Sequence, residues 1–528
     1  MTLSRCSPIL LSFLTGLGLW LSFPGGGEIW PLLSIALIPL LMALGGGSCR
    51  MAAIVGLTAG LAHFLPLLYW IVIVLGKYGG LAWFISLQAL LLLALYMSLY
   101  FALFAVLART ILRAFPAAVA LLLLPSLWVG IDWLRGVLFT GFPWMDLGYA
   151  LYQTPALIQI ADLVGHHGVT FLIVFCNTLL FLLFKARRGI VENLLLCCLG
   201  LCLFVGTGLY SSLRFADISG RISAAEAVRV NIGIVQGNID QSIKWSPAQQ
   251  KITVDTYLAL TRSLMQASGS PSLAVWPETA LPFYPGNDQM GPLKNLVAGQ
   301  DMALLTGAPW YEIIDRQNKK VKFYNSALLL EPDGYFAGKY FKTHLVPFGE
   351  YVPLKKLLPF LAPLVEAVGD FSSGTIDRPL VWKQAKTGIL ICYESVFPEL
   401  SRQWVQAGAN LLVNLTNDAW YGRSSAPYHS LAMSVLRAVE TRRSLIRSAN
   451  TGISAFVSPL GVIEARSGLF EPWAAAREVV LAEEETIWVR FGFLFAPLCL
   501  IAGLGGGIAA VFLVRRRERE IFHHPLVN

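Results

Sequence analysis

Long apolar stretches separated by short polar loops fill the first 212 residues of the chain, and one more apolar stretch lies near the C-terminus. About 20 consecutive apolar residues cross a bilayer as a helix. The pattern therefore predicts seven membrane spans, a polar domain and then an eighth span. The spans are expected at residues 8–23, 29–46, 51–75, 80–108, 117–134, 163–184, 191–212 and 491–514.

The first apolar stretch could also be the core of a secretory signal peptide, because Arg5 precedes it. We see no small-residue cleavage site, and further spans follow at once, so we favour an uncleaved helix. The segment 140–160 is different, since it combines turn residues with aromatic side chains such as Trp144. We expect an interfacial loop or a short re-entrant piece there.

Residues 225–485 alternate short apolar runs with amphipathic stretches, and this alternation predicts an α/β layered domain. Strands are predicted at 229–236, 272–276, 303–307, 324–330, 388–392, 410–415 and 453–457, and helices at 247–267, 398–407 and 427–448. The chain is thus divided into a membrane domain (1–214), the α/β domain (225–485), a C-terminal transmembrane helix (490–514) and a tail (515–528).

Composition supports a membrane protein, because 55% of the 528 residues are hydrophobic and only 14% are charged. A soluble domain carries about 25% charged residues. The net charge of +8 could suggest a nucleic-acid partner. Much of the excess, however, comes from Arg515, Arg516 and Arg517 and from arginines between spans, and the polar domain has no basic patch interleaved with aromatics. We expect no nucleic-acid partner.

The basic residues of the loops predict the orientation, because Lys and Arg accumulate on the cytoplasmic side. With a cytoplasmic N-terminus, the other side holds only Lys77 and Arg135, plus Arg214 and Arg490 at the domain junctions. The cytoplasmic side then holds Arg5, Arg50, Arg109, Arg113, Lys185, Arg187, Arg188 and the 515–519 cluster. Both termini are expected in the cytoplasm and the α/β domain outside it.

Cys392 is the only cysteine of residues 225–485, and it follows a short apolar run. Outside the cytoplasm paired thiols oxidise to disulfides, so a lone thiol is not a staple there. Glu278 and Lys342 precede it, and a carboxylate, an ammonium and a thiol suggest covalent acyl-transfer chemistry. The plainer alternatives are an inert buried Cys, a solvated Glu and a solvent-facing Lys. Glu350 or Glu394 could hold Lys342 in place.

The motifs around these residues resemble a known superfamily. Trp276-Pro277-Glu278, the segment from Lys342 to Glu350, and Cys392-Tyr393-Glu394 resemble the Glu-Lys-Cys triad of the nitrilase (carbon–nitrogen hydrolase) superfamily. Together with residues 237–245 and 417–422, the segment is more specifically similar to the apolipoprotein N-acyltransferase family. The resemblance implies a polytopic α-helical membrane bundle plus an extracytoplasmic α/β sandwich domain, nitrilase-like with αββα layers.

The resemblance also implies residue roles. Cys392 would be the nucleophile, Glu278 the general base and Lys342 the stabiliser of the tetrahedral intermediate. Glu350 would support Lys342, while Tyr393 and Glu394 would shape the oxyanion site. The positions that match substrate-pocket residues are Trp245, Asn325, Trp420 and Tyr421. Tyr421 stands where the family more often has Phe.

The implied reaction takes place in the bacterial inner membrane, with the catalytic domain in the periplasm. An acyl chain of a phospholipid, expected to be phosphatidylethanolamine, passes through a Cys392 thioester to the N-terminal amine of a diacylglyceryl apolipoprotein. No cofactor and no metal are expected, and we expect a monomer. Residues 352–371 are mostly apolar and suit a lid near the membrane, with core packing as the alternative. The loop 280–293 is a candidate second lid.

Three other functions are compatible with parts of the pattern. A membrane-anchored nitrilase-type amidase would share the triad but use water as the acceptor. A transporter with an appended domain is disfavoured, because the spans hold few ionisable groups. A fusion acting on polyprenyl-linked sugars is set aside, because no second polar domain is visible. His166 and His167 could suggest a metal, but no ligand cluster accompanies them in the sequence, so packing is expected.

Overall fold

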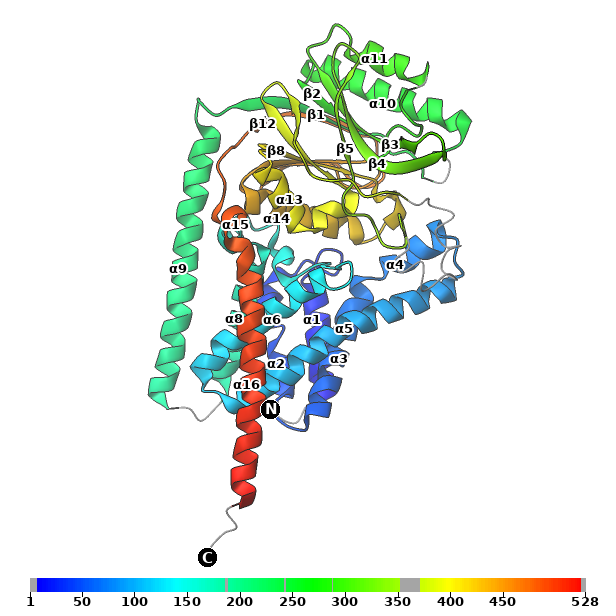
Figure 1. Cartoon of the computed structure of the whole chain (residues 1–528). Helices are drawn as coiled ribbons and strands as arrows, with labels where there is room; N and C mark the ends of the chain where they lie inside the picture. Colours follow the sequence, from blue (N-terminus) through cyan, green and yellow to red (C-terminus); the bar gives the residue numbers. More distant parts are fainter. Residues whose placement is uncertain (1–6, 186–188, 242–243, 287, 352–370, 524–528) are drawn as a thin grey trace, which may run out of the picture. The chain divides into compact units, whose positions relative to one another are not determined.

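The computed structural model of the chain describes residues 7–185, 189–241, 244–286, 288–351 and 371–523 (Figure 1). Contacts divide it into two compact units. The helical unit comprises Met1–Gly76, Leu81–Arg214 and Arg490–Asn528, and the α/β unit comprises Lys77–Gly80 and Phe215–Val489. The predicted lid over 352–371 falls outside the described residues, except for Phe371.

Six helices of the described residues are long and apolar enough to cross a membrane. They are α3 (Cys49–Leu67), α5 (Trp83–Ala114), α6 (Ala117–Val137), α8 (His166–Phe184), α9 (Ile190–Ser223) and α16 (Phe495–His523), the last preceded by α15 (Ile487–Arg490) and the 3₁₀ turn η10 (Gly492–Leu494). The multi-pass helical bundle is therefore confirmed. Its orientation in the membrane stays a prediction.

The start of the helical unit differs from the predicted spans. Residues 29–46 do not form one helix: the 3₁₀ turn η2 (Trp30–Ser34) is followed by the short α2 (Ile38–Ala43). Each begins with a proline in its first turn, where the missing N–H costs no hydrogen bond. The first helix, α1, covers only Pro8–Leu21, and α3 is followed by α4 (Trp70–Ile73) and the π-helical turn η3 (Val74–Tyr78). The predicted total of eight spans therefore stays a prediction.

The segment between α6 and α8 contains no spanning helix, as predicted, but it is not a surface loop. It consists of η4 (Leu147–Leu151), η5 (Pro155–Leu157) and α7 (Ala161–Val164). Trp144, Asp146 and Tyr149 are buried within the helical unit. The predicted interfacial loop is thus a packed part of the helical unit.

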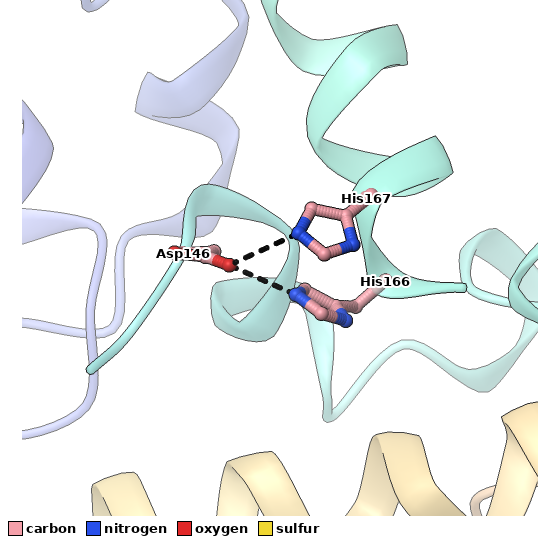
Figure 2. A group of neighbouring side chains, drawn as sticks. All are labelled: Asp146, His166 and His167. Atoms are coloured by element: carbon pink, nitrogen blue, oxygen red, sulfur yellow. Dashed lines mark hydrogen bonds and ion pairs between the residues drawn. The ribbon is translucent and has the colours of Figure 1, made fainter. Parts of the chain in front are cut away.

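Asp146 lies against His166 and His167, at the start of α8 (Figure 2). Its Oδ2 atom is 2.8 Å from Nε2 of His166 and 3.8 Å from Nε2 of His167. The expectation that no possible metal ligand accompanies the two histidines was therefore wrong, because the buried loop brings a carboxylate 20 residues away in the chain to them. The Oδ1 atom of Asp146 accepts a hydrogen bond from Arg135, so the carboxylate already has a cationic partner. A buried ion-pair network accounts for the group.

Two six-stranded sheets form the centre of the α/β unit. The first has the order β12-β1-β2-β3-β4-β5 and the second the order β11-β10-β9-β8-β7-β6. In each sheet three adjacent strands run parallel: β1, β2 and β3 in the first, and β7, β8 and β9 in the second. The first sheet comprises β1 (Arg229–Gln236), β2 (Leu273–Val275), β3 (Ala303–Asp315), β4 (Lys320–Leu330), β5 (Phe336–Phe341) and β12 (Trp473–Val480). The second comprises β6 (Leu380–Trp382), β7 (Ala385–Ile391), β8 (Leu411–Thr416), β9 (Ser444–Ala449), β10 (Ala455–Val457) and β11 (Ile463–Arg466).

Helices cover the outer face of each sheet (Figure 1). On one side lie α10 (Pro247–Ser268) and α11 (Gly291–Val297), and on the other α13 (Pro398–Gln406) and α14 (Ala426–Thr441). The sheets face one another, and the Ser448 hydroxyl donates to the carbonyl of Val275 across them at 3.2 Å. The unit is the predicted αββα sandwich.

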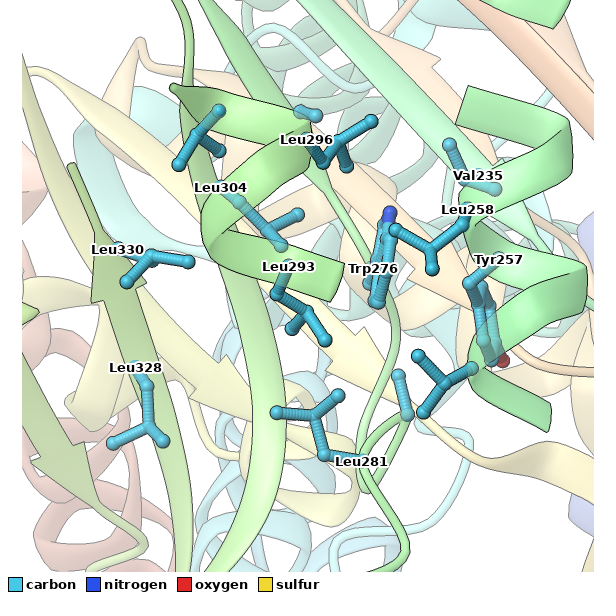
Figure 3. Packing of buried hydrophobic residues seen from close by; sticks show 14 of the residues in the cluster. Val235, Tyr257, Leu258, Trp276, Leu281, Leu293, Leu296, Leu304, Leu328 and Leu330 are labelled. Carbon is cyan, nitrogen blue, oxygen red and sulfur yellow. The ribbon is translucent and has the colours of Figure 1, made fainter. Parts of the chain in front are cut away.

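The core under α10 and α11 fixes the end of β2 (Figure 3). Trp276 is fully buried, stacks on Tyr257 at 5.1 Å between ring centroids, and donates through Nε1 to Thr261 at 3.0 Å. Leu281 and Phe283 belong to the same core, so this part of the loop 280–293 packs inside the domain instead of forming a lid. Glu278 lies between Trp276 and Leu281, the two anchored positions.

The strand predictions at 229–236, 272–276, 388–392 and 410–415 are confirmed within one or a few residues, as are the helices at 247–267 and 398–407. The helix predicted at 427–448 is wrong beyond Thr441. Arg442 adopts a left-handed conformation with φ 51°, and the chain continues as β9. The strands β5, β6, β11 and β12 were not predicted.

Candidate active site

Cys392 lies at a sharp turn at the end of a central strand. β7 ends at Ile391, and the 3₁₀ helix η8 (Cys392–Val396) begins at the cysteine itself. The backbone of Cys392 has φ 52°, which is uncommon for a residue other than glycine and is found at functional sites where the surroundings enforce it. The residue is partly exposed. The turn therefore presents a thiol at the carboxyl end of the second sheet.

Glu278 follows β2 and is buried. Its Oε1 atom accepts from Asn325 Nδ2 at 2.7 Å, and its Oε2 atom accepts from the backbone N–H of Asn417 at 2.8 Å. Burial raises the pKa of Glu278, and the charge of Lys342 opposes that rise. The side chain therefore combines a proton affinity above that of an ordinary glutamate with a fixed direction.

Lys342 follows β5 and is almost completely buried. Its Nζ atom lies 3.0 Å and 2.9 Å from the two carboxylate oxygens of Glu350. Burial by itself lowers the pKa of Lys342, but the charges of Glu350, Glu278 and Cys392 outweigh it, so the pKa is raised. Lys342 is thus a permanent cation at neutral pH.

Asn325, on β4, links the two carboxylates of the site. Its Nδ2 atom donates to Glu278 at 2.7 Å and to Glu350 at 2.9 Å. Glu350 also accepts from the backbone N–H of Val346 at 2.8 Å. The predicted support of Lys342 by Glu350 corresponds to a direct ion pair, while Asn325 contacts the acidic groups of the site.

The charges of Glu278 and Lys342 both affect the thiol of Cys392. Burial raises the pKa of Cys392 to about 12, with Glu278 adding to the rise and Lys342 opposing it. A thiol in this environment is protonated at neutral pH, so its attack needs a base that removes the proton during the reaction. Glu278 is a carboxylate near enough to affect the thiol electrostatically.

Glu394 and Tyr393 follow the cysteine, and their surroundings differ. The Oε1 atom of Glu394 accepts from the N–H groups of Thr343 and His344 and from the Tyr340 hydroxyl, at 2.7, 3.0 and 2.8 Å. Its Oε2 atom accepts from the N–H of Ile391 at 2.7 Å. Glu394 thus joins the segment carrying Lys342 to the last residue of β7, directly before Cys392. Tyr393 is buried against His344 and Phe397.

The aromatic candidates occupy two environments. Trp245 is 48% exposed, on the loop before α10. Trp420 and Tyr421 belong to the 3₁₀ helix η9 (Asp418–Tyr421) and are half-buried. Burial and then the charge of Cys392 raise the pKa of Tyr421 well above its usual range. Of the three, Tyr421 is the one whose pKa is raised by the charge of Cys392.

Each of the two units matches a known family model. Residues 15–179 match the family model described as "Apolipoprotein N-acyltransferase N-terminal domain", and residues 231–483 match "Carbon-nitrogen hydrolase". An apolipoprotein N-acyltransferase of Geobacter metallireducens is 42% identical, over 98% of this chain and 96% of that protein. One of Methylococcus capsulatus is 33% identical, over 97% of each.

The chain belongs to the apolipoprotein N-acyltransferase family. This membership makes it an enzyme of the acyltransferase class and accounts for both the helical unit and the αββα unit. A carbon–nitrogen hydrolase from Helicobacter pylori aligns with 51% of this chain and 94% of its own, at 18% identity and a TM-score of 0.37.

Sequence reasoning missed two contributors to the site of this acyltransferase-family chain. The first is the backbone N–H of Asn417, which no side-chain pattern could reveal, because it depends on where β8 ends beside β2. The second is Lys244, which is fully buried and donates to Thr279 at 2.9 Å. Its signal was its place within the segment 237–245, which had already been singled out for the resemblance.

Proposed function

We propose that the chain transfers an acyl chain from a membrane phospholipid to the α-amine of the N-terminal diacylglyceryl-cysteine of apolipoproteins. The observation that carries the proposal is the group formed by the buried Glu278 and Lys342 and the partly exposed Cys392 in a chain of this family. A thiol, a fixed carboxylate and a permanent cation are the groups that acyl transfer through a thioester requires.

In the first half-reaction the Sγ atom of Cys392 attacks the ester carbonyl carbon at the sn-1 position of the phospholipid. Glu278 takes the thiol proton as the carbon–sulfur bond forms. Lys342 stabilises the negative charge on the carbonyl oxygen. The carbon–oxygen bond then breaks, Glu278 returns the proton to the leaving alkoxide, and lysophospholipid departs. A thioester on Cys392 remains.

In the second half-reaction the neutral α-amine of the acceptor attacks the thioester carbon. Glu278 takes a proton from the attacking nitrogen, and Lys342 again stabilises the oxygen charge. When the carbon–sulfur bond breaks, the thiolate leaves and recovers the proton from Glu278. The product is an amide, and Cys392 returns to its starting state with no net proton held by the enzyme.

The donor is phosphatidylethanolamine, the protein acts as a monomer, and the steps above use no cofactor. The α/β unit lies on the periplasmic side of the bacterial inner membrane with both termini in the cytoplasm. The charge asymmetry of the loops supports this orientation. Trp245, Trp420 and Tyr421 line the path of the lipid substrates.

The test is mass spectrometry of the purified full-length protein incubated with phosphatidylethanolamine alone. We expect an acyl adduct on the peptide that contains Cys392, which neutral hydroxylamine removes and which disappears when a diacylated lipopeptide is added. Cys392→Ala should give no adduct while remaining folded. Release of free fatty acid from the lipid without an adduct would instead favour a hydrolase that uses water as the acceptor.

A further inference from the structure

We propose that Lys244 is a positioning residue for acyl transfer, one that holds Glu278 in its working direction and favours its ionised form. The inference rests on the proposed function, because it concerns the base of that reaction. Lys244 has no assigned role in the sequence motifs, which place Trp245 in the substrate pocket and Lys342 beside the intermediate.

The geometry connects Lys244 to the turn that carries Glu278. The Lys244 side chain is fully buried, and its Nζ atom donates to the hydroxyl of Thr279 at 2.9 Å. Thr279 directly follows Glu278 and has φ 47°, a conformation that a β-branched residue adopts only when its surroundings enforce it. The hydrogen bond from Lys244 is one such constraint, and it acts one residue from the carboxylate.

The loop that carries Lys244 also holds the other side of Glu278. The Oε1 atom of Gln241 accepts from Asn417 Nδ2 at 2.6 Å, and the backbone N–H of Asn417 donates to Glu278 at 2.8 Å. Ile239 is bonded in turn through its N–H to Asn450 at 2.9 Å. The loop therefore acts on Glu278 in two ways. Lys244 holds the turn that follows Glu278. Gln241 holds Asn417, whose backbone N–H donates to Glu278.

Charge supports the same conclusion. Burial lowers the pKa of Lys244 to about 7, and Glu278 is the group whose charge acts in the opposite direction. By reciprocity, a protonated Lys244 favours the ionised carboxylate. An ammonium without solvent is costly unless a counter-charge lies near it, so the lysine and the carboxylate stabilise each other's charged forms. The charged and titratable groups that interact with Glu278 are Lys244, Lys342, Glu350, Cys392 and Tyr421.

The neighbouring residues Lys244 and Trp245 differ in exposure, so they are suited to different roles. Trp245 is 48% exposed, whereas the preceding residue is fully buried. One residue of the loop is therefore available to a substrate, while its neighbour is fixed beside the base.

The test measures how the first half-reaction of the full-length protein in detergent depends on pH. The rate of acyl-enzyme formation from phosphatidylethanolamine with a labelled sn-1 chain is followed without acceptor from pH 5 to pH 8. Omitting the acceptor matters, because its own amine titrates near neutrality. The variants are Lys244→Gln, which removes the charge but keeps a hydrogen-bond donor, Lys244→Met, which removes both, and Thr279→Val, which keeps the charge. Lys251→Met removes an exposed lysine of α10 and serves as the charge control.

We expect Lys244→Gln and Lys244→Met to move the acidic limb of the rate profile to higher pH. Without the cation the pKa of Glu278 rises, so less of the base is ionised at a given acidic pH. A movement of about one pH unit corresponds to roughly tenfold slower acylation on that limb. Thr279→Val should lower the plateau and leave the limb in place, and Lys251→Met should match the wild type.

A folded Lys244→Gln protein with the wild-type acidic limb overturns the inference while leaving the proposed function intact. If neither Lys244 variant folds, the residue is structural and the inference is likewise overturned. If the wild type forms no acyl-enzyme at any pH, the proposed function fails, and the inference fails with it.

Discussion

Asn325 lies between two buried carboxylates and donates a hydrogen bond to each of them. Two acidic groups in one buried site repel each other, and the charge of Glu350 raises the pKa of Glu278. A neutral amide between them supplies a donor to both without adding charge. The acidic half of the site therefore depends on an amide at this position.

We expect Asn325→Asp, which has nearly the same shape, to slow acyl-enzyme formation by about 100-fold or more, the usual cost of removing one well-placed donor. The new carboxylate adds repulsion and cannot donate when ionised. The labelled-phospholipid assay measures the effect, and Asn295→Asp, on the exposed face of α11, is the control. Acylation by Asn325→Asp within threefold of the wild-type rate would contradict this account.

The protonation of Cys392 gives a second prediction at this scale. Iodoacetamide reacts with thiolates, and burial raises the pKa of Cys392 to about 12. The folded protein should therefore be alkylated at Cys392 at a rate that still rises between pH 7 and pH 9.5. Peptide mass spectrometry separates this site from the other cysteines. A rate that is constant from pH 7.5 upward would mean that the thiolate is already formed.

At the scale of single residues, Glu278 and Cys392 could be selected from the sequence because each follows a short apolar run. Lys342 could be selected only through the resemblance of its segment, because a lysine in a turn-rich segment is expected to face solvent. Lys244 could not be selected from an apolar run. A lysine in a polar loop beside a tryptophan is expected to be exposed, and its burial arises from contact with Thr279, 35 residues away in the chain.

Among the secondary-structure elements, α14 shows where periodicity misleads. Apolar side chains continue from the helix through Leu445 and Ile446, so the pattern predicts one long helix. The structure ends it at Thr441 through the left-handed Arg442, where neither glycine nor proline marks the break. β9 then enters the middle of the second sheet, and only the pairing partners β8 and β10 select that conformation.

The contact of β3 with the turn after β2 carries a prediction. A Cβ atom added to Gly307 would lie 2.4 Å from the N atom of Thr279 and 2.6 Å from the Cα atom of Glu278. Gly307→Ala must displace that turn, and overpacking of this kind costs about 1–3 kcal/mol. A displacement of about 1 Å can slow catalysis roughly 100-fold.

We therefore expect Gly307→Ala to lose at least tenfold in acylation rate, by the rule that such displacements cost up to about 100-fold. Gly291→Ala in α11 is the matched control, because its added Cβ meets no atom within 4 Å. Thermal unfolding followed in parallel separates loss of the fold from loss of geometry. Equal activity of the two variants would show that the turn yields without moving Glu278.

The helical unit contains a buried polar network in which the carboxylate of Asp146 contacts Arg135 and His166. Figure 2 shows Asp146 with His166 and His167. Asp146→Asn leaves Arg135 with Asp132, 3.5 Å away, as its remaining carboxylate partner in the described residues. Breaking a buried pair costs about 3–5 kcal/mol. We expect the thermal midpoint of the purified protein to fall by several degrees.

Asp377→Asn, an exposed position of the α/β unit, should leave the midpoint unchanged. Because the chain has two units, unfolding need not be a single transition. The fall in thermal midpoint caused by Asp146→Asn should appear in the transition of the helical unit. Added zinc should not restore the thermal midpoint of Asp146→Asn, because an ion-pair network needs no metal. Restoration by zinc in the wild type after chelation would instead indicate a metal site.

At this largest scale, hydropathy predicted the membrane bundle and strand–helix alternation predicted an α/β layered domain. The αββα sandwich followed only from the resemblance to the nitrilase superfamily. The ends of the short helices could not be predicted, because residues 29–46 are almost entirely apolar and only the prolines indicate the break. The buried loop around Asp146 was also beyond reach, since its polar side chains are satisfied by partners far away in the chain.

The strand β1 pairs with β12 along its whole length, from Arg229 opposite Val480 to Gln236 opposite Trp473. During synthesis, the edge of β1 that pairs with β12 has no partner strand until more than 230 further residues have been added. A nascent chain that stops after Cys392 would carry the proposed nucleophile but also an unpaired strand edge, which is a known site of unwanted association. We therefore expect incomplete chains to be inactive and to be degraded readily by proteases, so that a partly folded chain does not react with membrane lipids.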